Sequence, residues 1–258
     1  LSPESATSFN LGAIFQQGGL NASIDYYNFD FEDTIIVESQ DAVVAAALAA
    51  LADPTAPQGI LNRLTFDGGT QSAGTIARIR TNIVNGPDVQ TSGVDLRADY
   101  TFDDLFGAEI TLGGEATIVL EYDVGDYIVE DVTIAGFDGL GQLNRDNFGR
   151  PIPETKANFF ANYARGIHNL RADMRYISEY DDLRPSITGN GKTIDSFTSF
   201  DLTYNLDLTD EYGFRAFVSG QNITDEDPPF ARLDLNYDPY PHPSYGRVIK
   251  VGATATFG

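Results

Sequence analysis

Apolar and polar residues alternate with a period of two along several segments of the chain. In residues 109–123 the even positions are apolar or small and include Ile110, Leu112 and Leu120, whereas most odd positions are charged or carry a hydroxyl group. Residues 170–180 and 200–209 repeat the pattern. Successive side chains of a β-strand point to opposite faces, so each segment predicts a strand with one apolar and one polar face.

Weaker copies of this alternation bring the number of predicted strands to nine. They occupy residues 9–16, 20–26, 94–102, 157–164, 214–221 and 247–257. A soluble antiparallel sheet with one buried face would alternate in the same way, so the period alone does not identify a membrane protein. Segment length favours one, because an ordinary strand has about 5 or 6 residues and a tilted membrane strand needs about 9 to 11.

The connections between the predicted strands alternate between short and long. The short ones are residues 17–19, 103–108, 165–168 and 210–213, and the long ones are residues 33–85, 124–153, 182–193 and 225–246. Outer-membrane barrels have short periplasmic turns and long extracellular loops, so the pattern indicates such a barrel. Arg171 and Arg175 are then expected to face the lumen, since a cation facing lipid at the midplane costs about 2 to 4 kcal/mol.

Aromatic residues at the strand ends suggest the two interfacial girdles of a membrane barrel. Tyr100, Phe102 and Phe257 lie at short-turn ends, and Tyr122 and Tyr180 lie at long-loop ends. Aromatic residues collect at both rims of outer-membrane barrels, although they also favour strands in general.

One segment departs from the period of two. Residues 41–52 are rich in Ala and Leu, follow Ser39 as a candidate N-cap and precede Asp53 and Pro54, which predicts a short helix. Twelve residues cannot span a bilayer. Because the segment lies within the longest loop, we expect a helix folded over the extracellular mouth. A signal-like or amphipathic membrane helix is the alternative.

Composition and charge exclude several other classes of protein. No apolar run approaches the about 20 residues of a membrane-spanning helix. The chain begins at Leu1 without an initiator Met or a visible signal peptide, so we expect it to be trimmed. The net charge of -22 argues against nucleic acid as a partner. Cysteine is absent, and His168 and His242 stand far apart, so no metal site, cofactor or enzyme is predicted.

Four segments resemble the C-terminal barrel of TonB-dependent receptors. Residues 1–12 (LSPESATSFNLG) are similar to the family's Leu-x-Pro-Glu entry into a strand, and residues 85–102 contain its Gly-Val-Asp strand. Residues 220–230 (GQNITDEDPPF) resemble its exit into the last extracellular loop, and residues 237–258 its terminal strand. The resemblance implies an all-β, antiparallel transmembrane β-barrel, with residues 1–258 providing about nine C-terminal strands of an expected 22 and neither the plug nor the upstream strands.

The resemblance also implies a function and a location. The intact protein is expected to import a scarce ligand, such as an iron–siderophore complex, cobalamin or a glycan, across the Gram-negative outer membrane. Its implied partners are outer-membrane lipid, the TonB inner-membrane complex reached through an absent N-terminal region, and the barrel-assembly machinery, which would recognise Phe257. In the family an aromatic residue commonly ends the chain, whereas here Gly258 follows Phe257.

The long loops supply the candidate ligand-binding residues. Arg184, Tyr237, Tyr240 and His242 carry cationic, aromatic and imidazole groups suited to an iron chelate or a glycan, although each is also an ordinary residue of a solvated loop. Two other functions stay open at this point. One is a passive porin whose acidic lumen favours cations, and the other is a soluble acidic β-protein that binds sugar or calcium.

Overall fold

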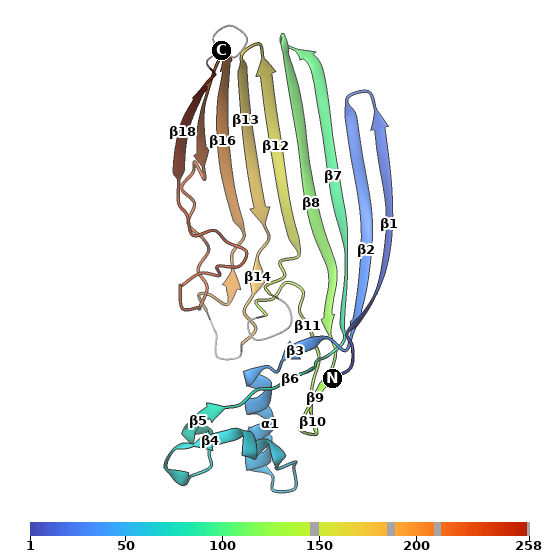
Figure 1. The fold of residues 1–258 in the computed structure, drawn as a ribbon, viewed down its shortest axis with the longest axis vertical. Helices are drawn as coiled ribbons and strands as arrows, with labels where there is room; N and C mark the ends of the chain where they lie inside the picture. Colours follow the sequence, from blue (N-terminus) through green and yellow to red (C-terminus); the bar gives the residue numbers. More distant parts are fainter. Residues whose placement is uncertain (145–149, 185–188, 209–212, 257–258) are drawn as a thin grey trace.

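Nine long antiparallel strands form one continuous sheet in which every strand pairs with its neighbour in sequence order (Figure 1). The computed structural model describes residues 1–144, 150–184, 189–208 and 213–256. The nine strands are β1 (Ser5–Gln17), β2 (Leu20–Glu32), β7 (Val89–Leu105), β8 (Ala108–Val124), β12 (Thr155–Arg165), β13 (His168–Ile177), β16 (Phe197–Leu208), β17 (Phe214–Gln221) and β18 (Val248–Ala255). The short β11 (Phe137–Asp138) pairs with the end of β8. All nine predicted strands are present, although the one predicted over 170–180 ends at Ile177, and positions 209 and 257 of two others lie outside the described residues.

The sheet is an open piece of barrel wall. The first and last strands of the path, β1 and β18, each have one neighbour. In the described ranges, no helix has both the length and the hydropathy required to cross a bilayer.

The register places the apolar positions of all nine strands on one face. One row across the sheet, from β7 to β18, consists of Tyr100, Leu112, Ala161, Ala172, Leu202, Gly220 and Ile249. A row three positions along the strands, on the opposite face, contains Ser23, Arg97, Glu115, Asn158, Arg175 and Ser199. A slip of one residue at any pair would mix the two faces, so the alternation also fixes the register.

The apolar face ends before the strands do. On β2 the positions that follow Tyr26 on the same face are Asn28 and Asp30, and the strand continues to Glu32. Sequence alternation therefore predicted the apolar band and missed the part of the strand beyond it. At the level of Asn28, strand β8 has one residue more than its neighbour β7. Val119 pairs with Gly93 and Glu121 pairs with Ser92, so Leu120 between them has no partner in β7.

The extra residue corrects one predicted girdle position. Beyond Leu120, Glu121 and Tyr122 exchange faces, so Tyr122 leaves the apolar face. Tyr180 is not in the girdle either, because its side chain is buried among the loops. Tyr100 and Phe102 at the short-turn end do lie exposed, with ring centroids 4.5 Å apart.

Short turns join the strands at one end of the sheet and long loops join them at the other (Figure 1). The turns at Gly18 and Gly166 use positive φ angles of 58° and 55°, which glycine adopts without steric cost in two-residue hairpins. The predicted helix is α1 (Gln40–Ala52), and the Ser39 hydroxyl accepts a hydrogen bond from the Ala42 backbone N–H as the predicted N-cap. It lies beyond the strand ends on the long-loop side.

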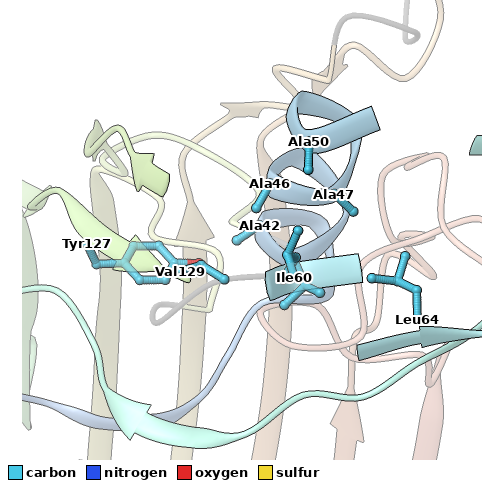
Figure 2. Close-up of a cluster of buried hydrophobic side chains, with 9 residues drawn as sticks. Ala42, Ala46, Ala47, Ala50, Ile60, Leu64, Tyr127 and Val129 are labelled. Atoms are coloured by element: carbon cyan, nitrogen blue, oxygen red, sulfur yellow. The ribbon is translucent and has the colours of Figure 1, made fainter. Parts of the chain in front are cut away.

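The longest loop folds into a small unit with its own core, which we call the loop module. It comprises β3 (Ile35–Val37), α1, η1 (Gly59–Arg63), β4 (Leu64–Phe66), η2 (Asp67–Gly69), η3 (Ala73–Thr75), β5 (Ile76–Ile79) and β6 (Ile83–Asn85), joined by the hairpin of β9 (Tyr127–Val129) and β10 (Val132–Ile134) from the next long loop. Figure 2 shows four alanines of α1 packed with residues of the neighbouring segments, and all of the following are buried: Ala42, Ala46, Ala47, Ala50, Ile60, Leu64, Tyr127 and Val129. Small side chains let the neighbouring segments approach the helix closely.

A buried ion pair fastens the loop module. The Arg63 guanidinium contacts the Glu38 carboxylate through both of its terminal nitrogens, and each side chain is about 5% exposed. Arg63 also donates to the Arg80 carbonyl at 3.1 and 2.9 Å and to Glu130 of the second loop at 3.4 Å. The ion pair is thus fully hydrogen-bonded, as a buried pair must be, and it links two loops.

The loop module should depend strongly on this pair. We expect Glu38→Gln to destabilise it by about 3 to 5 kcal/mol, because the substitution removes the main counter-charge of a buried guanidinium. Hydrogen exchange should accelerate in α1 and β9 and stay unchanged in β13. Equal exchange of α1 in the variant and the parent would contradict this expectation, and Glu32→Gln at an exposed strand end provides the control.

The two faces of β16 should respond differently to a cation. We expect Leu202→Arg on the apolar face to destabilise the folded protein by about 2 to 4 kcal/mol in lipid vesicles, because a guanidinium would enter hydrocarbon. Thr203→Arg, one residue along on the polar face, should change the unfolding free energy by less than about 1.5 kcal/mol, mainly through the lost hydroxyl contact with Ser219. Urea titration of both variants measures the difference, and equal losses would contradict the assignment of the faces.

Candidate functional site

Three long loops meet around a second core next to the strand ends. Its buried members are Leu143, Tyr180, Ile194 and Ala231, with Leu233 packed against them. The backbone ties the same loops together, since the Leu143 N–H donates to the Asp181 carbonyl at 3.0 Å and β14 (Tyr180–Asp181) pairs with β15 (Thr193–Ile194). Residues far apart in sequence are therefore held in one rigid cluster.

A buried polar network lies within this cluster. The Tyr180 hydroxyl donates to Asp238 Oδ2 at 2.9 Å, and the Tyr240 backbone N–H donates to Oδ1 at 3.1 Å. Asp238 is fully buried. Burial, together with the Asp238 charge, raises the pKa of the Tyr180 hydroxyl, so Tyr180 stays protonated and remains the donor.

His242 packs against the same network without polar partners. Its ring stacks on Tyr180 at a centroid distance of 6.0 Å and meets Phe197 edge-on at 5.5 Å. The side chain is 2% exposed, and neither ring nitrogen has a hydrogen-bond partner among the described residues. Burial, and to a smaller extent the Lys156 charge, lowers the pKa of His242 from 6.5 to about 4, so the ring is neutral at physiological pH.

A pocket opens beside this network. It has a volume of about 310 Å³ and is lined by two stretches of chain, namely Leu143, Asn144, Arg150 and Pro151 from one loop and Leu233, Asp234, Leu235, Tyr237, Asp238, Pro239 and Tyr240 from another. The Arg150 guanidinium carbon lies 4.0 Å from the centroid of the Tyr240 ring, which is close enough for a cation–π contact. We refer to this hollow as the rim pocket.

The structure separates the four predicted loop residues into three settings. Tyr237 and Tyr240 line the rim pocket, whereas His242 is buried behind it, in contact with Tyr180. Arg184 is outside the pocket lining, where its guanidinium pairs with the buried Asp182 and donates to the Arg232 carbonyl at 3.0 Å. Arg150 and Asp234 line the pocket and were not predicted from the sequence, because nothing in their own loops marks them.

The polar face of the sheet carries a second group of charged residues. Arg171 pairs with Asp173 at 2.7 Å and Arg175 with Asp201. Both arginines border a groove together with Arg97, Glu115 and Asn158, on the face opposite the apolar rows. Arg97 and Lys156, on the same wall, form no ion pair with any residue in the described ranges. Phe257 lies outside the described residues.

The chain resembles known proteins in both sequence profile and fold. The profile of the family described as TonB dependent receptor-like, beta-barrel matches residues 1–223. No curated protein sequence matches the chain.

Several solved structures with a similar fold are receptors or transporters by name. The chain is similar to the copper transporter OprC (14% identity, TM-score 0.58), to a variant of the ferric enterobactin receptor PfeA from Pseudomonas aeruginosa (15%, 0.57) and to the siderophore receptor PirA from Acinetobacter baumannii (14%, 0.57). Each alignment covers 98% of this chain and 31%, 31% and 32% of the respective relative. The chain thus spans about a third of the length of these proteins.

Acid should loosen the cluster around His242. The unfolded chain binds a proton at His242 below about pH 6.5, whereas the folded chain does so only near pH 4. The cluster's stability should therefore be complete above pH 6.5 and fall as the pH drops, by about 3 kcal/mol near pH 4. Hydrogen exchange of β14 and β15 at pH 7.5 and 4.5 measures this loss.

Two variants isolate the histidine. His242→Phe keeps the contacts with Tyr180 and Phe197 and cannot take up a proton, so it should flatten the pH dependence. His168→Phe, at an exposed position on β13, should leave the dependence as in the parent. If the stability of the His242→Phe variant changed with pH as much as that of the parent, the pH effect would belong to another group.

Proposed function

The chain belongs to the TonB-dependent receptor-like β-barrel family, and we propose that the intact protein actively imports a scarce ligand across the outer membrane of Gram-negative bacteria. In this proposal the nine strands form part of the barrel wall, and a plug in the lumen is moved by the TonB complex of the inner membrane. The ligand meets the loops first and crosses the lumen when the plug moves. No covalent chemistry is required.

One observation carries the proposal, namely that the long-loop end of a two-faced wall holds a preformed pocket whose lining includes exposed polar groups. The rim pocket lies among loops that are held together by their own core. A preorganised pocket binds without first ordering its loops, which suits capture of a ligand at low concentration. A diffusion channel has no need of such a site.

The polar face fits the lumen side of the wall. We infer that Arg171 and Arg175 face the lumen, where water and the plug solvate them, and that Arg97 and Lys156 do the same. The apolar face contacts lipid, and Phe257 at the end of the chain would be read by the barrel-assembly machinery.

Uptake by the intact receptor should depend on energy. Cells that produce it should deplete its ligand from the medium, and deletion of the TonB gene or dissipation of the proton-motive force should abolish that depletion. The comparison of spent media from producing and non-producing strains measures the effect. The purified receptor should show no steady conductance in planar bilayers, because a plug closes the lumen. Depletion without TonB, together with an open-pore conductance, would instead favour the passive porin.

A further inference from the structure

The rim pocket has a lining that selects for a particular ligand chemistry. Its volume of about 310 Å³ is at the lower end of small-molecule sites, which run from about 300 to 1,000 Å³. Such a space suits one or two rings of a ligand whose remainder extends into solvent.

The lining presents both donors and acceptors that no described residue satisfies. The Asp234 carboxylate and the hydroxyls of Tyr237 and Tyr240 make no hydrogen bond within the described ranges, and the Arg150 guanidinium contacts only the Tyr240 ring. A guanidinium offers five N–H donors and a carboxylate accepts several hydrogen bonds. Vicinal hydroxyl groups, each both donor and acceptor, match such a set.

The charges of the lining argue against an anionic ligand. Among the lining residues that the structure describes, Arg150 is the single cation, whereas Asp234 is exposed and Asp238 is buried behind the surface. A multiply anionic chelate or a phosphate group is bound most strongly where several cations give charge-assisted hydrogen bonds. The chain as a whole has a net charge of -22, which repels anions at long range.

The apolar part of the lining favours a ring with a nonpolar face. Tyr240 is 60% exposed, and Pro151, Pro239 and Leu235 border the same hollow. Such surfaces pack against C–H groups, while the polar groups at the edge fix the orientation of the ligand. A sugar ring combines a C–H face with a rim of hydroxyls.

We propose that the rim pocket binds a neutral glycan, with a sugar ring against Tyr240 and its hydroxyls hydrogen-bonded to Asp234 and Arg150. This inference rests on the proposed import function and names its class of ligand. It separates the chain from its structural neighbours named for siderophores, with which it shares the fold at 14 to 15% identity.

Calorimetry with the intact purified receptor tests the assignment. The probes are neutral disaccharides of glucose, xylose, mannose and galactose, with ferric citrate and a ferric tris-catecholate as the anionic alternatives. We expect at least one disaccharide to bind with an affinity that changes less than about twofold between 50 and 500 mM salt, since screening acts on charged partners. Tyr240→Ala should weaken binding at least about tenfold, and Asp234→Asn by about five- to tenfold.

Matched variants separate the pocket from the rest of the loop surface. Tyr245→Ala removes a tyrosine that is 75% exposed and outside the pocket lining, so it should leave the affinity unchanged. Tyr240→Phe keeps the ring and should bind more tightly than Tyr240→Ala. Failure of every disaccharide to bind the folded receptor would overturn the proposal, as would salt-sensitive binding of a ferric complex that requires Arg150.

The outcomes also distinguish this proposal from import itself. A receptor that binds no sugar and still depletes another ligand in a TonB-dependent manner would refute the glycan assignment and leave the import function standing. A receptor that binds sugar but transports nothing would refute the import function and leave the glycan assignment standing.

Discussion

The structure depends on one constraint, which is that a strand in hydrocarbon must pair all of its backbone N–H and C=O groups with neighbouring strands. Pairing with both neighbours fixes the register, and the register decides which side chains meet lipid. In this chain the row from Tyr100 to Ile249 contains no charged residue, while a row on the opposite face, three positions along, contains Arg97, Glu115 and Arg175. The extra residue Leu120 lies where the apolar band ends, so Glu121 and Asp123, which the exchange of faces brings to the outer side, lie beyond that band.

The loops are free of that constraint and are organised by other interactions. They build two small cores, and each holds a buried polar network: Glu38 with Arg63 in the loop module, and Tyr180 with Asp238 beside the rim pocket. Buried polar groups are costly unless they are satisfied, so such networks specify one arrangement of the loops. The rigidity of the pocket therefore originates in contacts behind its surface, while the groups that face the ligand remain unpaired.

The strands and the helix could be predicted from the sequence because their signals are local. A period of two identifies a strand from its own residues, and Ser39 followed by an Ala-rich run identifies α1. The rim pocket could not be predicted, since Arg150 meets Tyr240 across 90 positions of sequence through loops without periodicity. Tyr180 was misassigned for the same reason, because its partner Asp238 lies in another loop. For Arg184 the sequence did contain a local indication of an ion pair, because Asp182 is only two residues earlier and close enough to pair with it.

Under the proposed function, the charge distribution indicates that the loops select the ligand and that the lumen wall lets it pass. Along the wall, Arg171 and Arg175 pair with Asp173 and Asp201, and Arg97 and Lys156, which form no ion pair within the described ranges, exert little Coulomb attraction on a neutral ligand. At the rim, Tyr240 and Asp234 lie exposed and available. Tight binding at the mouth and weak binding along the lumen follow from this arrangement. A transporter needs that order, because a ligand that was held as strongly by the wall as by the rim would leave the barrel slowly once the lumen opened.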